Sequence, residues 1–145
     1  QPYLVTGIDA YCNRLKHYTS FAFEVIPALK NTKNLSEDEQ KQREGELLLA
    51  QLKPTDRVVL LDENGAKPSS EQFADQMQKH RLASVKNLVF IIGGPYGFSA
   101  EVYARASEKL SLSAMTFSHQ MVRLIFVEQL YRAFTIIKGE PYHHK

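Results

Sequence analysis

Short apolar runs separated by polar segments recur along the chain and predict buried strands. Arg57 to Asp62 (RVVLLD) and Asn87 to Ile92 (NLVFII) are apolar without alternation, as is typical of central parallel strands whose two faces are both covered. A third short strand is expected at Lys109 to Ser113, and Glu63 to Gly65 predicts a turn. The alternation of apolar with polar or small residues from Phe21 to Pro27 predicts a further strand.

Between these strands, apolar residues recur at helical spacing. Tyr3 to Tyr18 has this pattern. Ser36 to Leu52 and Ser69 to Leu82 each begin with a serine that has Glu or Gln three residues later, the signature of a capping box. A short helix is expected from Ser99 to Ala106 and a long one from Ser118 to Ile137. Strands that alternate with helices predict an α/β fold with a mainly parallel sheet flanked by helices.

The chain is expected to form one domain over residues 1–145, because no internal repeat or low-complexity linker interrupts it. Its long final helix is apolar on more than one face, and such a helix must be covered on nearly every side. One face can pack on the sheet. The other is expected to pack on a second copy of the chain, in a homodimer.

Composition and charge narrow the function classes. Hydrophobic residues make up 43% of the chain and charged residues 23%, as in ordinary globular proteins, and no apolar run is long enough to span a membrane. Cys12 is the single cysteine and no signal peptide is recognisable, so a cytoplasmic protein is expected. The net charge of +2 is small, so contact with a nucleic acid would need a local basic patch. No Cys/His spacing is typical of a metal site, and no metal is expected.

Distinctive residues follow three predicted strands, at the edge where an open parallel sheet binds its ligands. They are Leu61-Asp62, the glycine-rich Gly93 to Gly97 (GGPYG), and Ser113 to Phe117 (SAMTF). Glycines would let a ligand approach the main chain closely, but the spacing matches neither the dinucleotide fingerprint nor a phosphate loop. On residue types alone, the glycines could form only a tight turn, and Met115 and Phe117 could belong to the core.

Four sequence blocks between Leu88 and His143 together carry a more specific signal. They are IIGGPYG, LSLSAMTFSHQMVRL, EQLYRAF and GEPYH. In this order they resemble the SPOUT-class 23S rRNA (pseudouridine-N3) methyltransferases, and the earlier EGELLLAQLKPTDRVVLLDENGAKPSSEQFA is similar to that family as well. The resemblance covers nearly the whole chain. Family members usually begin with a short strand that ends near Val-Gly-Lys, so this first strand is expected to be absent here.

The resemblance implies a SPOUT fold with a C-terminal trefoil knot, a departure from the general rule that chains do not thread. It also implies a homodimer that binds S-adenosyl-L-methionine (SAM) and acts on 23S rRNA in the ribosome or its large subunit, with no membrane partner. The implied SAM-binding residues lie at the three strand ends described above. They are Leu61, Gly93, Leu112, Ser113, Ala114, Met115, Thr116 and Phe117.

The implied reaction places a methyl group on an imide nitrogen that must lose its proton. An enzyme for it needs to align the donor with the acceptor and to stabilise the imide anion. Arg132 is a candidate for the positive charge, Tyr142 for stacking or hydrogen bonding, and His143 for the general base. Tyr142 and His143 could instead only order the tail, and Glu128, four residues before Arg132, could form a solvated helix pair with it.

The sequence is also compatible with two other functions. One is a non-catalytic module that binds RNA or the ribosome and has kept the knot without methyl transfer. The other is a SPOUT methyltransferase that acts on tRNA. The lack of an appended RNA-binding domain favours a small enzyme that recognises an assembled particle over the tRNA alternative.

Overall fold

A computed structural model describes residues 2–144 of the chain, which pack as two compact units. Unit 1 combines the residues up to Phe23, Lys67–Ser84 and the residues from Leu112 onward. Unit 2 combines Glu24–Ala66 and Val85–Ser111. The chain therefore passes from one unit to the other several times, and each unit is built from segments that are far apart in the sequence.

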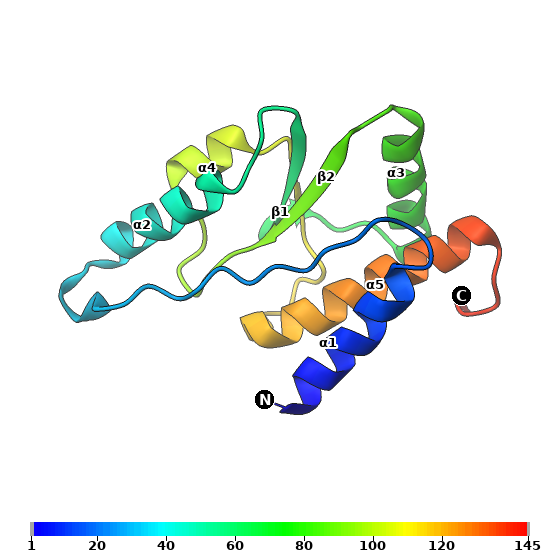
Figure 1. Cartoon of the computed structure of the whole chain (residues 1–145), viewed down its shortest axis with the longest axis horizontal. Coiled ribbons are helices and arrows are strands. Elements are labelled where there is room, and N and C mark those ends of the chain that lie inside the picture. Colours follow the sequence, from blue (N-terminus) through cyan, green and yellow to red (C-terminus); the bar gives the residue numbers. More distant parts are fainter. Residues whose placement is uncertain (1, 145) are drawn as a thin grey trace. The chain divides into compact units, whose positions relative to one another are not determined.

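Unit 2 holds a parallel sheet whose strand order is β2-β1-β3. The longest strand, β1, lies in the centre, and α2 and α4 lie side by side next to the sheet (Figure 1). The elements are η1 (Thr32–Asn34), α2 (Glu37–Ala50), β1 (Asp56–Ala66), β2 (Asn87–Ile92), α4 (Ala100–Arg105) and β3 (Glu108–Leu110).

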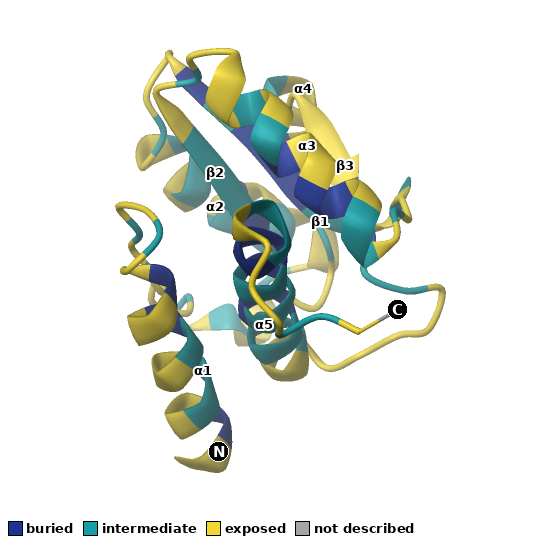
Figure 2. Ribbon diagram, turned by 90° about the vertical axis from the view of Figure 1, so that its right-hand side faces the viewer, coloured by how far each residue is buried: buried dark blue, intermediate teal, exposed yellow. Residues whose placement is uncertain are grey.

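The core of unit 2 forms on the central strand. Val58 and Leu60 of β1 are fully buried and pack with Ile91 of β2, and with Phe98 and Val102 around the start of α4. Figure 2 shows β1 in the colour of buried residues along much of its length. This burial confirms the prediction that RVVLLD forms a central parallel strand with both faces covered.

Unit 1 is helical and is organised around α5 (His119–Lys138). The helices α1 (Pro2–Leu15) and α3 (Ser70–Leu82) both pack on it (Figure 1). Its buried side chains come from all three helices. They include Leu4, Leu15, Phe73, Met77, Phe126, Val127, Leu130, Ala133 and Phe134.

Local sequence signals predicted most element boundaries correctly. Ser36 and Ser69 each form the capping box that the sequence indicates. The Ser36 Oγ accepts the Glu39 N–H at 3.1 Å, and the Ser69 Oγ accepts the Gln72 N–H at 3.1 Å. These bonds satisfy N–H groups that the first turn of a helix leaves without partners. The α/β fold with a parallel sheet is confirmed.

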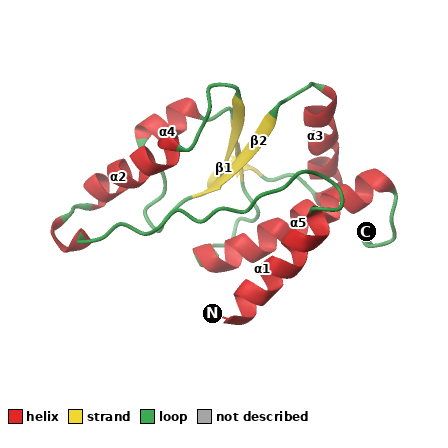
Figure 3. Ribbon diagram, in the orientation of Figure 1, coloured by secondary structure: helices red, strands yellow, loops and turns green. Residues whose placement is uncertain are grey.

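The strand predicted from Phe21 to Pro27 is wrong. Figure 3 shows this part of the chain as a loop between α1 and α2, and its main-chain groups join no strand of the described residues. Phe21 and Phe23 are half-buried, whereas Val25 is exposed. Alternating burial requires only an extended chain with one covered side, and a strand also requires a neighbour that completes its hydrogen bonds.

The turn predicted at Glu63 to Gly65 is also wrong, because β1 continues to Ala66. Leu61 and Ala66 both pair with Leu110 of β3, so the residues between them form an irregular bulge within the strand. The third strand ends at Leu110 rather than at Ser113. The turn-forming residues thus interrupt the register of β1 without ending the strand, as bulges do.

The contact between α2 and α4 allows a first prediction, at Gly45. A Cβ added there would lie 2.4 Å from the Ser99 Oγ, which is held in place as the N-cap acceptor for Val102 N–H. Gly45→Ala should therefore lower the free energy of unfolding by about 1–3 kcal/mol, the usual cost of overpacking, although alanine favours helices. In a Ser99→Ala background this cost should shrink. Urea unfolding measures the free energy lost on Gly45→Ala in the parent and in the Ser99→Ala background. Equal losses in the two backgrounds would contradict the prediction.

Candidate functional site

Two of the predicted ligand-binding residues, Leu61 and Gly93, lie in unit 2, where the pairing between β1 and β2 ends. Leu61 of β1 pairs with Ile92, the last residue of β2, and Gly93 follows directly. A Cβ on Gly93 would come within 2.9 Å of the ring of Phe98, a residue of the unit 2 core. Glycine is therefore required here by packing, and a larger residue would disturb the core and the loop together.

The other six predicted ligand-binding residues, Leu112 to Phe117, form an irregular segment in unit 1. Met115 is 75% exposed and Phe117 is 38% exposed, so the alternative that they are core residues is wrong. The Met115 N–H donates to the Ser113 Oγ at 3.0 Å. The N–H groups of Ala114 and Thr116 donate to no acceptor within the part of the chain that the structure describes. The segment thus presents apolar side chains together with free main-chain donors.

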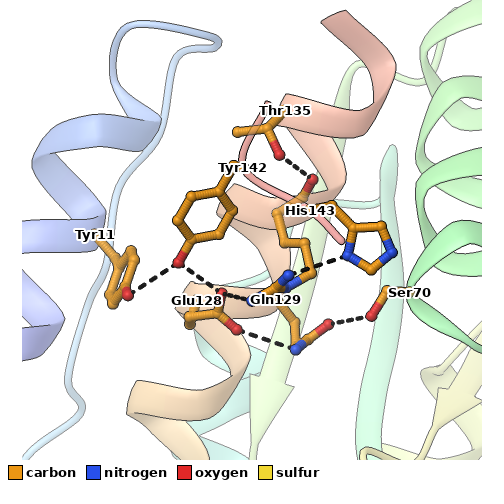
Figure 4. Close-up of polar contacts among 8 residues, drawn as sticks. Tyr11, Ser70, Glu128, Gln129, Thr135, Tyr142 and His143 are labelled. Carbon is orange, nitrogen blue, oxygen red and sulfur yellow. Dashed lines mark hydrogen bonds and ion pairs between the residues drawn. The ribbon is translucent and has the colours of Figure 1, made fainter. Parts of the chain in front are cut away.

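The three predicted catalytic residues, Arg132, Tyr142 and His143, lie together in unit 1. Arg132 comes from α5, and the tail after α5 brings Tyr142 and His143 back beside it. Figure 4 shows Tyr142 and His143 close to Glu128 and Gln129 of the same helix. The guanidinium carbon of Arg132 lies 4.9 Å from the centre of the Tyr142 ring, within the range of a cation–π contact. Arg132 Nη1 lies 3.0 Å from Nδ1 of His143.

Glu128 binds both Arg132 and Tyr142 through one oxygen atom. Its Oε2 accepts from Arg132 Nη2 at 2.9 Å and from the Tyr142 hydroxyl at 3.0 Å. The side chains of Arg132 and Glu128 are only 23% and 19% exposed, so the alternative of a solvated helix pair is wrong. Because water is largely excluded, this ion pair is stronger than one on the surface.

Tyr142 is held as a neutral hydrogen-bond donor. Burial, and then hydrogen bonds with Tyr11 and Glu128, raises the pKa of the Tyr142 hydroxyl above its ordinary value. A neutral hydroxyl has one proton, and that of Tyr142 is donated to Glu128. In the 3.1 Å contact between the two tyrosine hydroxyls, Tyr11 is therefore the donor.

The second ring nitrogen of His143 contacts α3. Nε2 lies 3.2 Å from Oε2 of Glu71, in the first turn of that helix. A further link between α5 and α3 runs from the Ser70 hydroxyl to Gln129 Oε1 at 2.9 Å, and from Gln129 Nε2 to Glu128 Oε1 at 3.0 Å (Figure 4). The polar cluster therefore joins α3, α5 and the tail.

Sequence reasoning missed most of these supporting residues. Glu128 had one usable signal, its position four residues before Arg132 on a helix. Tyr11 and Glu71 had none, since Tyr11 is 131 residues from Tyr142 and Glu71 is 72 residues from His143. Only the packing of α1 and α3 on α5 brings them to the cluster.

Within residues 2–144, none of the helices is both long and apolar enough to cross a membrane. In the same residues, no three His, Cys, Asp or Glu side chains gather as they would around a metal ion.

Comparison with known proteins identifies the family. The family model for predicted SPOUT methyltransferases matches residues 1–143. A protein of Christiangramia forsetii named ribosomal RNA large subunit methyltransferase H is 62% identical over 138 residues, which cover 95% of this chain and 88% of that protein. A protein of the same name from Bacteroides thetaiotaomicron is 57% identical over 145 residues, which cover 100% of this chain and 92% of that protein. The chain therefore belongs to the SPOUT methyltransferase family.

Proposed function

We propose that this protein is a SAM-dependent methyltransferase that methylates N3 of a pseudouridine in the 23S rRNA of the large ribosomal subunit. Family membership and the names of its relatives support the reaction class and the rRNA substrate. The observation that carries the proposal for this chain is the polar cluster of Arg132, Glu128, Tyr142 and His143. It holds one cation beside a tyrosine and a histidine, as the stabilisation of an anionic base requires.

The residues proposed for SAM fit such a ligand in chemistry. Leu61, Leu112 and Met115 offer apolar contacts, and the free N–H groups of Ala114 and Thr116 can bind the edges of an adenine. Gly93, which follows β2 directly, is a further proposed contact. The remaining proposed contacts are Ser113 and Phe117. When bound, SAM supplies an activated methyl group, so the protein itself mainly has to position the acceptor.

On the acceptor side, Arg132 is proposed to stabilise the negative charge that develops on the target imide. The Arg132 Nε is buried and has no hydrogen-bond partner among the described residues. A buried donor without an acceptor costs about 1–3 kcal/mol, and a substrate oxygen would recover this cost only if the side chains that cover the Nε moved aside. Tyr142 is proposed to stack on or hydrogen-bond to the base. His143 is the third residue of the proposed site and contacts Arg132 through its Nδ1.

A cytoplasmic homodimer is also part of the proposal, with residues 1–145 as one SPOUT domain. The trefoil knot remains a prediction from the family resemblance. The dimer contact is expected on the parts of α5 that α1 and α3 leave open. Phe126 and Leu130 are unsuitable for testing it, because both are buried within unit 1 and an aspartate there would disrupt the core.

Loss of the protein tests the proposed function directly. Mass-spectrometric mapping of 23S rRNA should show one N3-methylated pseudouridine that disappears in cells lacking the protein and returns with the parent gene. Arg132→Ala should fail to restore it. In a methyl-transfer assay on ribosomal particles the same change should lower kcat about 100-fold, as the loss of an oxyanion-hole donor does.

The control is Lys79→Ala, which removes an equal charge from an exposed position on α3 and should leave the rate unchanged. Methylation of tRNA instead of 23S rRNA would favour the second function left open by the sequence. SAM binding without transfer to any RNA would favour a non-catalytic module.

Met115 tests the SAM pocket more cleanly than Gly93, since it lies outside the core. If its side chain covers the ligand, Met115→Ala should weaken SAM binding roughly 10- to 100-fold, as expected when a buried methionine is truncated. Leu82→Ala is the matched control because Leu82 is 76% exposed. Calorimetry measures both. If Met115→Ala bound SAM with the Kd of the parent, Met115 would not be part of the SAM pocket.

Light scattering should give a mass of twice 16.5 kDa at micromolar concentration. Met121, in the first turn of α5, is 37% exposed and carries an apolar side chain. Met121→Asp should shift the equilibrium towards the monomer, because a dimer would bury an unpaired charge. Met121→Leu should behave like the parent. A parent protein that stays monomeric would remove the dimer from the proposal.

A further inference from the structure

We propose that Glu71 is a positioning residue that fixes the tautomer of His143 and, through it, the orientation of the Arg132 guanidinium. The importance of that orientation for methyl transfer rests on the proposed function above. The tautomer itself does not, because it follows from the contacts that the ring of His143 makes.

The contact with Arg132 shows which nitrogen of His143 carries the proton in this structure. A guanidinium has only N–H donors and cannot accept a hydrogen bond. Nδ1 of His143, 3.0 Å from Arg132 Nη1, must therefore be the acceptor. A neutral imidazole with an accepting Nδ1 has its proton on Nε2.

The contact with Glu71 completes the assignment. Nε2 faces the Glu71 Oε2 at 3.2 Å, and a carboxylate only accepts. The two contacts agree, since one requires a lone pair on Nδ1 and the other requires a proton on Nε2. Without an acceptor at Glu71, the Nε2 proton would lose its partner, and the free-energy difference between the two neutral tautomers would shrink to the cost of turning a donor on Nδ1 towards Arg132.

This arrangement assigns His143 a different role from that of a general base. Both ring nitrogens are engaged, and the His143 side chain is only 15% exposed. Neither nitrogen has a free lone pair that could take a proton from a substrate. Instead, His143 Nδ1 holds one terminal nitrogen of Arg132 while Glu128 Oε2 holds the other at 2.9 Å, so the plane of the guanidinium is fixed from two sides.

The carboxylate of Glu71 orients the imidazole of His143, and this imidazole orients the guanidinium of Arg132. The three groups lie on different elements. Glu71 belongs to α3, His143 to the tail and Arg132 to α5. A carboxylate that orients a histidine in this way does not touch the reacting atoms itself. Loss of such a partner commonly lowers activity, although every residue that contacts the substrate is still present.

Nitrogen-15 NMR of the full-length protein tests the tautomer without any substrate. Long-range ¹H–¹⁵N spectra distinguish a protonated Nε2 from a protonated Nδ1, and the His143 signals are identified by their loss in His143→Asn. The parent should show a protonated Nε2. Glu71→Ala should show a mixture of the two tautomers. Glu71→Gln should keep the parent pattern, because the amide oxygen can still accept from Nε2.

Methyl transfer to ribosomal particles tests the consequence. Glu71→Ala should lower kcat roughly 10- to 100-fold, as expected of a misoriented group, with an unchanged KM for SAM, and Glu71→Gln should recover most of the rate. Asp75→Ala is the matched control, because Asp75 lies one turn further along α3, where it pairs with the exposed Lys79.

A parent-like tautomer in Glu71→Ala would overturn the inference, and so would a mixed tautomer with the full parent rate. Equal losses in Glu71→Gln and Glu71→Ala would also overturn it, since they would assign the effect to the charge of Glu71 rather than to its accepting oxygen. A parent protein that methylates no large-subunit RNA would instead contradict the proposed function. The NMR result would then still decide the tautomer.

Discussion

A half-buried guanidinium must find acceptors within the protein, and that of Arg132 organises the candidate catalytic site. Its partners, Glu128 and His143, come from α5 and the tail, and the ring of Tyr142 covers it from one face. A cation withdrawn from water is stable only when it is paired. The tail that follows α5 therefore gains a defined position from the same contacts that hold the Arg132 guanidinium in place.

The partners of Arg132 have partners of their own, which extend the network across unit 1. Glu128 also accepts from Tyr142 and Gln129, and His143 also contacts Glu71. These bonds connect α3 and α5 at the polar cluster, while the Phe73–Phe126 contact connects the same helices in the core. Helix packing and site geometry are consequently linked, because a shift of α3 would move Glu71 and, with it, the ring of His143.

Unit 2 contributes to the proposed function in a different way. Its central strand is buried on both faces, and the pairing of this strand with β2 brings Leu61 beside Ile92, the residue before Gly93. The irregular segment from Leu112 to Phe117 belongs to unit 1. It exposes Met115 and Phe117, and the N–H groups of Ala114 and Thr116 have no acceptor among the described residues.

The sequence by itself determined the class of fold, most helix ends and the family. The apolar runs of β1 and β2, the capping boxes at Ser36 and Ser69, and the four ordered blocks are local features, and local interactions decide them. Only the tertiary structure decided that Phe21 to Pro27 is no strand and that Glu71 and Tyr11 support the cluster. A strand needs a neighbour, and a hydrogen bond needs both partners in place. Residues more than 70 positions apart, such as Glu71 and His143, meet only after the helices that carry them have packed.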